Sequence, residues 1–198
     1  MFTGIIQELG IIRQRRVRGG VITLSVQAPK TAAKVIPLES VAIHGVCLTV
    51  VTRSADSLMF EMIPETQHLT TLGSLAVGDQ VNIEPSLAMT DRLNGHFVFG
   101  HVDGLGRIVR RRLVKGELIL EVSLPRSLGK FVVAKGPITV DGVSLTVGER
   151  PSATSFTIHL IPETLRRTTL RALKVGAHVN LEVDYLAKLV AQQLCRRP

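Results

Sequence analysis

The sequence contains few cysteines, no tryptophan and no long apolar run. Its 198 residues include two cysteines, Cys47 and Cys195, one tyrosine and no tryptophan. Two cysteines cannot form a disulfide framework, and without clustered histidines they cannot form a structural zinc site. Apolar runs such as 131–134 fall far below the roughly 20 residues that span a bilayer. We therefore expect neither a disulfide-rich secreted protein nor a membrane-spanning helix.

The N-terminus has no basic stretch leading into an apolar one, so we expect no secretory leader and a cytoplasmic location. Hydrophobic residues make up 45% of the chain and charged residues 20%, which predicts an ordered globular protein.

Positive charge is in excess, with 24 Lys and Arg against 16 Asp and Glu, a formal net charge of +8. The basic residues lie in separate groups at 13–18, 107–115, 166–171 and 196–197. They form no stripe and are not interleaved with the aromatic residues that single-strand binders use for base stacking. This distribution argues against a nucleic-acid partner and favours a surface that attracts anionic metabolites.

The chain repeats itself at an offset of 96 to 98 residues. The matching pairs are 45–50 with 142–147, 63–66 with 161–164, 70–72 with 168–170, and 81–84 with 179–182. Several collinear matches at a nearly constant offset are not explained by chance. The period is too long for a solenoid unit, so we expect two homologous domains, 1–95 and 96–184, each with its own core.

Short β-branched runs alternate with turn residues in each copy, which predicts β-strands. The expected strands are 21–26, 40–43, 48–52, 58–62 and 80–84, then 118–122, 138–140, 145–147, 156–160 and 178–183. About six short strands per copy without a long helix predict an all-β fold of two tandem six-stranded antiparallel Greek-key barrels.

One helix is expected, at the C-terminal end. Apolar residues recur at helical spacing over 185–194, within a terminal segment 185–198. A short helix with a single apolar face needs a barrel or a sister chain to pack on.

Polar side chains share one face of the repeated strand. Cys47 and Thr49 lie on the face opposite the apolar residues, and Ser144 and Thr146 repeat this arrangement. An ordinary solvated strand face would look similar. Retention of these side chains in both copies favours a binding role.

Two further features carry polar groups. The Ile-Pro-Glu-Thr segments after a strand bring a carboxylate, a hydroxyl and backbone N–H groups into one turn, which suits a heterocycle, although a plain tight turn would also fit. His101 has no counterpart in the first copy, where Ile5 aligns with it. It can move protons near neutral pH, although a lone histidine is more often structural. The histidines form no metal-ligand cluster, and no Walker or dinucleotide-binding motif is present.

Several motifs together identify a family. They are Met-Phe-Thr-Gly-Ile at 1–5, Gly-Val-Cys-Leu-Thr-Val at 45–50, Gly-His-Phe-Val at 95–98, Gly-His-Val-Asp-Gly at 100–104, Lys-Gly at 135–136, Asp-Gly-Val-Ser-Leu-Thr-Val at 141–147 and Asp-Tyr-Leu-Ala-Lys at 184–188. Over essentially its full length the chain resembles the riboflavin synthases of the alpha-subunit type.

The resemblance implies an enzyme that dismutates two molecules of 6,7-dimethyl-8-ribityllumazine. One substrate donates a four-carbon unit to the other, which gives riboflavin and 5-amino-6-ribitylaminouracil. It also implies no cofactor and no metal, and a homotrimer assembled through C-terminal helices with sites between barrels of different chains. A contact with lumazine synthase, which makes the substrate, is a further expectation.

The resemblance also implies the site residues. The N-terminal ligand site would comprise Gly4, Ile5, Ile6, Cys47, Leu48, Thr49, Glu61, Met62, Ile63, Pro64, Glu65 and Thr66. The C-terminal site would comprise Gly100, His101, Val102, Lys135, Ser144, Leu145, Thr146, Leu160, Ile161, Pro162, Glu163, Thr164 and Leu165. Phe2 would form an apolar wall, and Asp184 is counted among the substrate-binding residues.

The hypothesis for catalysis is that His101, with Thr146 or Ser144, assists proton transfer at the 7-methyl group. Cys47 and Ser144 would stabilise or supply the nucleophile that adds at C7.

Three positions depart from the family pattern: His44 replaces an Asn, Asn94 a Gly, and Phe99 a Ser. Phe99 is the largest change, and it would either narrow the pocket or add apolar burial. Two alternatives stay open: a non-catalytic lumazine-binding antenna protein, and a basic RNA-binding pair of barrels.

Overall fold

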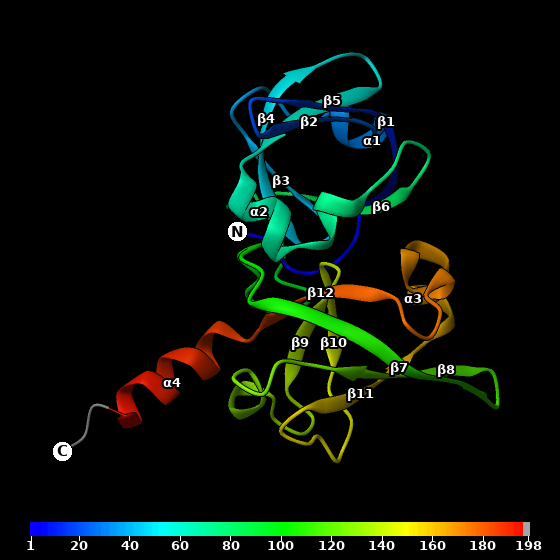
Figure 1. The fold of residues 1–198 in the computed structure, drawn as a ribbon, viewed down its shortest axis with the longest axis vertical. Coiled ribbons are helices and arrows are strands. Elements are labelled where there is room, and N and C mark those ends of the chain that lie inside the picture. The colour runs from blue at the N-terminus through cyan, green and yellow to red at the C-terminus, as the bar shows by residue number, and fades with distance from the viewer. Residues whose placement is uncertain (196–198) are drawn as a thin grey trace.

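The computed structural model describes residues 1–195 and contains two six-stranded antiparallel sheets followed by a helix (Figure 1). The first sheet consists of β1 (Glu8–Arg18), β2 (Val21–Gln27), β3 (Ser40–Ile43), β4 (Val46–Arg53), β5 (Ser57–Met62) and β6 (Gln80–Pro85). The second consists of β7 (Gly104–Val114), β8 (Glu117–Ser123), β9 (Pro137–Val140), β10 (Val143–Thr146), β11 (Ser155–Leu160) and β12 (His178–Val183).

The helical segments are short except for the last. The α-helices are α1 (Pro29–Ala32), α2 (Pro64–Leu69), α3 (Pro162–Arg167) and α4 (Tyr185–Cys195), and the 3₁₀ turns are η1 (Thr71–Ser74), η2 (Gly129–Phe131) and η3 (Thr169–Ala172). Each Ile-Pro-Glu-Thr segment therefore opens a short helix with proline in its first turn, where the missing N–H costs nothing. The sequence had predicted a turn there.

The predicted all-β fold class is confirmed. The first sheet closes into a barrel in the order β1-β2-β5-β4-β3-β6, in which β6, β3, β4 and β5 form a Greek key. The second sheet has the equivalent order β10-β9-β12-β7-β8-β11, and its two end strands meet through a bridge between Val147 and Ile158.

Each predicted strand is present, but β1 and β7 were not individually predicted. Both are 11 residues long, and their second halves carry runs of exposed arginine rather than alternating apolar residues. They pair with β2 and β8 as long hairpins that extend beyond the core. Arginine-rich strands of this kind lack the period-2 signal on which the prediction depended.

Each sheet encloses an apolar core of its own. Val46, Leu48 and Val50 of β4 are at most 6% exposed and face into the first barrel, whereas Thr49 is exposed on its outer face. In β10, Val143 is buried and Thr146 is exposed in the same way. The predicted alternation of faces is therefore confirmed in both copies.

The two barrels meet across an approximate twofold axis. The N–H of Phe2 donates to the carbonyl of Val98 (2.7 Å), and the N–H of Val98 donates back to Phe2 (3.1 Å). Asn82 Nδ2 donates to the carbonyl of Asp141 and Asn180 Nδ2 donates to that of His44, each at 2.9 Å. Equivalent residues of the two repeats thus make reciprocal bonds.

The residues that precede the first strand of each sheet, 1–7 before β1 and 96–103 before β7, are called here the leading segments. Each lies against the barrel of the other repeat. Ile6 is buried in the core of the second barrel, and Val102 packs against the core of the first. A division of the chain at residue 95 separates the two sheets but assigns each leading segment to the barrel that it does not cover.

Helix α4 extends away from the second barrel (Figure 1). Its apolar side chains Leu186, Leu189, Val190 and Leu194 are 40–60% exposed. Within residues 1–195, every helix is too short or too polar to span a bilayer. Arg196 and Arg197 of the last basic group, and the end of the expected segment 185–198, lie outside the described residues.

Candidate active site

Gly100 brings the second leading segment onto Cys47. The N–H of Cys47 donates to the carbonyl of Gly100 at 2.9 Å. Gly100 has φ +74°, and a Cβ added to it would lie 2.7 Å from the Cβ of Cys47. Only glycine allows both this conformation and this close approach. The following residue, His101, is therefore held at the first barrel, beside the Cys47 strand.

Gly4 makes the equivalent contact with Ser144. The N–H of Ser144 donates to the carbonyl of Gly4 at 2.8 Å, and a Cβ on Gly4, which has φ +77°, would lie 2.6 Å from the Cβ of Ser144. The predicted grouping was wrong in this respect. The resemblance implies a grouping of 4–6 with Cys47 and of 100–102 with Ser144. The leading segments are exchanged between the barrels.

Two buried glutamates hold the leading segments in place. Glu84 accepts hydrogen bonds from the N–H groups of Thr3 (2.8 Å) and Gly4 (2.9 Å). Glu182 accepts the equivalent bonds from Phe99 (2.7 Å) and Gly100 (2.9 Å). Burial raises the pKa of Glu84 and raises that of Glu182 to about 7.

Neither carboxylate was predicted from the sequence. They end the repeated Val-Asn-Ile-Glu and Val-Asn-Leu-Glu segments, which were interpreted only as strands. The available signal was a glutamate that recurs at the same strand position in both repeats, because buried carboxylates need hydrogen-bond partners. The structure places both glutamates on the face opposite the core residues Ile83 and Leu181.

His96 contacts Ser144. Its Nδ1 lies 2.7 Å from Ser144 Oγ, and its Nε2 lies 3.2 Å from Thr139 Oγ1. Burial lowers the pKa of His96, which favours the neutral imidazole. The predicted partnership of His101 with Ser144 is not formed in this chain, and among residues 1–195 His101 makes no hydrogen bond. The sequence showed His96 within the Gly-His-Phe-Val motif but gave no reason to pair it with Ser144.

Lys135 and Thr146, both expected in the C-terminal site, lie together. They line one groove of about 660 Å³ on the second barrel, together with Glu149 and His159. Lys135 has φ +63° and forms an exposed ion pair with Glu149 at 3.2 Å. The groove therefore offers a cation and a hydroxyl beside the strand that carries Ser144.

The other predicted site residues differ in what they can offer a ligand. Leu48, Met62 and Leu160 are at most 6% exposed in the cores, so only their backbone atoms can reach a ligand. Ile63 and Ile161 are 57% and 60% exposed just before the short helices and can form apolar walls.

Two of the predicted polar residues already have hydrogen-bond partners within the chain. Glu163 accepts hydrogen bonds from Arg167 and Arg166, and these contacts lower its pKa. Asp184 Oδ1 accepts the N–H of Leu186 at 3.1 Å, so it caps helix α4.

Phe2 is fully buried and packs with Ala42, Val98 and Cys47 between the barrels. In this chain Phe2 therefore packs against the Cys47 strand inside the junction between the barrels and does not form the wall of an open pocket.

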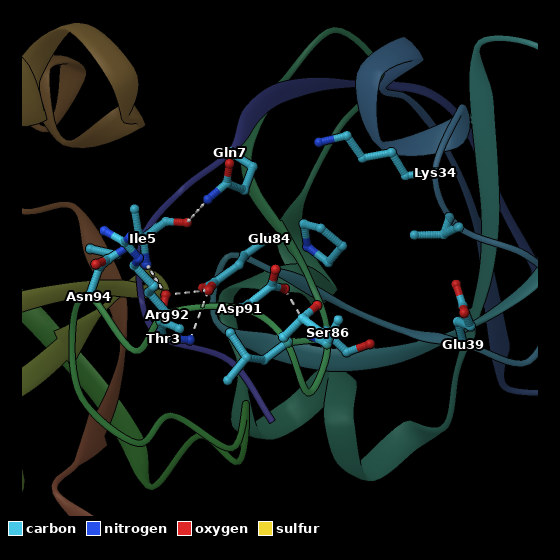
Figure 2. Close-up of a pocket in the computed structure, with 15 residues that line it drawn as sticks. Thr3, Ile5, Gln7, Lys34, Glu39, Glu84, Ser86, Asp91, Arg92 and Asn94 are labelled. Atoms are coloured by element: carbon cyan, nitrogen blue, oxygen red, sulfur yellow. Dashed lines mark hydrogen bonds between the residues drawn. The ribbon is translucent and has the colours of Figure 1, made fainter.

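A separate groove of about 700 Å³ lies beside the first leading segment (Figure 2). Thr3 and Ile5 line one side, Lys34 and Glu39 the other, and Glu84 lies between them with its bond to Thr3. The connection that contains Asn94 completes the rim, so this departure from the family pattern is a surface feature.

Within residues 1–195, no group of three or more His, Cys, Asp or Glu side chains is arranged to hold a metal ion. The expected absence of a metal or cofactor stays a prediction.

Comparison with known proteins relates both repeats to one family. The lumazine binding domain matches residues 3–86 and 99–184. The chain is 36% identical to riboflavin synthase of Actinobacillus pleuropneumoniae over 100% of this chain and 92% of that protein. It is 40% identical to riboflavin synthase of Mycobacterium tuberculosis (strain ATCC 25618 / H37Rv), over 96% of each chain. It is 38% identical to riboflavin synthase of Bacillus subtilis (strain 168), over 95% of this chain and 87% of that protein. The chain belongs to the riboflavin synthase family.

Solved structures related to this family member include three crystal structures of LumP. Its complex with 6,7-dimethyl-8-(1'-D-ribityl) lumazine superposes with a TM-score of 0.83 at 25% identity, over 92% of this chain and 99% of LumP. The riboflavin complex gives a TM-score of 0.84 at 27% identity with the same coverage. The riboflavin synthase family fold is thus shared with a protein that binds both a lumazine and a flavin.

Proposed function

We propose that this chain is a riboflavin synthase that converts two molecules of 6,7-dimethyl-8-ribityllumazine into riboflavin and 5-amino-6-ribitylaminouracil. A four-carbon unit passes from one substrate to the other. All atoms of the two substrates are recovered in the two products, so the reaction consumes no external oxidant or reductant.

The observation that carries this proposal is the pair of related but non-identical polar sites. Gly100 closes on a thiol, Cys47, with His101 next in the chain, and Gly4 closes on a hydroxyl, Ser144, with a bonded histidine. A reaction between two identical substrates needs two sites for the same heterocycle that treat it differently. Holding both substrates in the reacting orientation can remove about 7–11 kcal/mol from a bimolecular barrier, so modest proton transfer suffices beyond that.

Ser144 acts at C7 of the substrate bound to the second barrel. With the proton of His96 on Nε2, directed at Thr139 Oγ1, its Nδ1 accepts the Ser144 hydroxyl proton. A hydroxyl bonded to a neutral imidazole is a better nucleophile, or a better orienting group for water, than a free one. Lys135 and Thr146 bind polar atoms of the same substrate from the neighbouring groove.

His101 and Cys47 act on the substrate bound to the first barrel. His101 accepts a proton from the acidic 7-methyl group, and Cys47 stabilises the exocyclic methylene anion that this leaves at C7. Each barrel therefore has its own histidine, and His101 acts with Cys47 rather than with the Thr146 or Ser144 that the resemblance implies.

Assembly into a homotrimer, with each working site between barrels of different chains, is part of the proposal. Helix α4 supports it, because a one-sided apolar helix that extends from the barrels is stable only when something covers it. A contact with lumazine synthase and the cytoplasmic location stay predictions.

The test is to mix the purified chain with 6,7-dimethyl-8-ribityllumazine in the presence of a chelator and to follow riboflavin by absorbance. Turnover is the expected result. The LumP complexes favour one competing function, a carrier of lumazine or flavin without chemistry. Binding without product would support the carrier and refute the synthase.

A further inference from the structure

Phe99 connects the catalytic segment to the C-terminal helix. Its ring centroid lies 4.8 Å from that of Tyr185 in helix α4, with an interplanar angle of 53°. On its other side the centroid lies 6.2 Å from that of His101, at an interplanar angle of 30°. Both separations are in the range of attractive aromatic pairs. Phe99 therefore points neither into a barrel core nor into an open pocket, the two outcomes that the sequence had left open.

A second tie joins the same two elements on the far side of His101. Lys188 Nζ of helix α4 lies 2.6 Å from Asp103 Oδ1, and the two side chains are only 26% and 19% exposed. Asp103 Oδ2 also accepts the N–H of Val183 at 2.9 Å. The segment 99–103 is thus fixed to the start of α4 at both of its ends.

His101 itself lacks such fixing. Its side chain is exposed and, within residues 1–195, takes part in no hydrogen bond or ion pair, whereas His96 is bonded through both ring nitrogens. Its ring stacks on that of Phe99. Within residues 1–195, this stacking is therefore the contact available to orient the His101 imidazole.

We propose that Phe99 and Tyr185 are positioning residues that hold the His101 imidazole toward the Cys47 site and couple its orientation to helix α4. The inference rests on the proposed function, because it concerns the histidine that moves the substrate proton. Loss of either ring leaves His101 in place but free to rotate. The fraction of productive orientations then falls, so kcat falls while substrate binding is retained.

The experiment is a double-mutant cycle on riboflavin formation. Phe99→Leu removes the aromatic face and keeps apolar bulk, and Tyr185→Ala removes the ring that supports it. Each should lower kcat about three- to tenfold with less than a twofold change in KM, the signature of an interaction that matters in the transition state. In the His101→Ala background each should lower kcat by less than a further twofold, because the residue through which it acts is gone.

The matched control is Phe131→Ala. Phe131 is a half-buried aromatic residue of η2, a turn that also contacts α4, but it lies apart from the Phe99 contacts. Its effect on kcat should be the same with and without His101. Tyr185→Phe keeps the ring and should recover most of the turnover lost in Tyr185→Ala.

A spectroscopic readout tests the contact without turnover. The His101 ring proton signals, identified by their loss in His101→Ala, should shift in Phe99→Leu and Tyr185→Ala. Unchanged signals would overturn the proposal. If Tyr185→Ala dissociates the assembly, Phe99→Leu alone serves as the test, because Phe99 lies outside helix α4.

Equal losses of kcat with and without His101, or a raised KM at unchanged kcat, would overturn the positioning role. An unmodified chain that forms no riboflavin would instead overturn the proposed function itself, and the role of His101 with it.

Discussion

The junction between the barrels depends on two asparagines, and replacing them should have equal effects. Asn82 is fully buried, donates to the carbonyl of Asp141 (2.9 Å) and accepts the N–H of Thr169 (2.8 Å). Asn82→Ala leaves the buried carbonyl of Asp141 and the half-buried N–H of Thr169 without a partner. The first costs about 1–3 kcal/mol and the second less, so the expected loss of stability is about 1–4 kcal/mol. Asn180 makes the mirror pair of bonds at the same distances, so Asn180→Ala should lose the same amount.

The assay is equilibrium urea unfolding at one fixed protein concentration, since assembly makes stability concentration-dependent. Asn94→Ala serves as the control, because Asn94 is exposed and has no side-chain hydrogen bond within residues 1–195. It should change stability by less than about 0.5 kcal/mol. A loss of similar size to the control for either junction variant, or losses that differ by more than about 2 kcal/mol, would refute the twofold account of the junction.

Three further predictions concern the site and its pH response. His101→Ala should lower turnover by about 10²- to 10⁴-fold, the range of general acid–base catalysis, and unaltered turnover would contradict its role. Gly100→Ala should lower both turnover and thermal stability through its clash with the Cys47 strand, whereas Gly19→Ala, with φ +56° and nothing within 4 Å, should cost only about 1 kcal/mol of stability. Burial raises the pKa of Asp141 to about 7. Between about pH 4 and 7 the folded chain therefore keeps the Asp141 carboxyl protonated, whereas the unfolded chain releases the proton. The contribution of Asp141 to the free energy of unfolding falls as pH rises through that window. The free energy of unfolding of Asp141→Asn, relative to that of the unmodified chain, should therefore be about 2 kcal/mol higher at pH 7 than at pH 5, as measured by denaturant unfolding. A relative stability that does not depend on pH would contradict the raised pKa of the buried carboxyl.

The sequence was sufficient for the fold class because the repeat is local and periodic. Alternating apolar residues such as Val46, Leu48 and Val50 indicate which face of a strand is buried, and the same pattern occurs in both repeats. The arginine-rich halves of β1 and β7 were not found, since they extend beyond the core and carry no apolar alternation.

The sequence was a poorer guide to which residues meet in each site than to which segments form the sites. Tertiary contacts decide which barrel a leading segment covers. They are the pairing of Phe2 with Val98 and the close approach of Gly4 and Gly100 to the opposite repeat. The contact between His96 and Ser144 spans 48 residues and has no signal in sequence spacing. His44, a departure from the family pattern, is buried at φ +49° at the junction, and burial lowers its pKa to about 4.

Two lumazines react with each other in this protein under the proposed function, and the stoichiometry of the products tests this most directly. Purified chain and 6,7-dimethyl-8-ribityllumazine are incubated to completion without nucleotide, and substrate and both products are measured by chromatography. We predict one riboflavin and one 5-amino-6-ribitylaminouracil for every two lumazines consumed. Lumazine that remains bound and unconsumed, or riboflavin formed without the pyrimidine, would contradict the account.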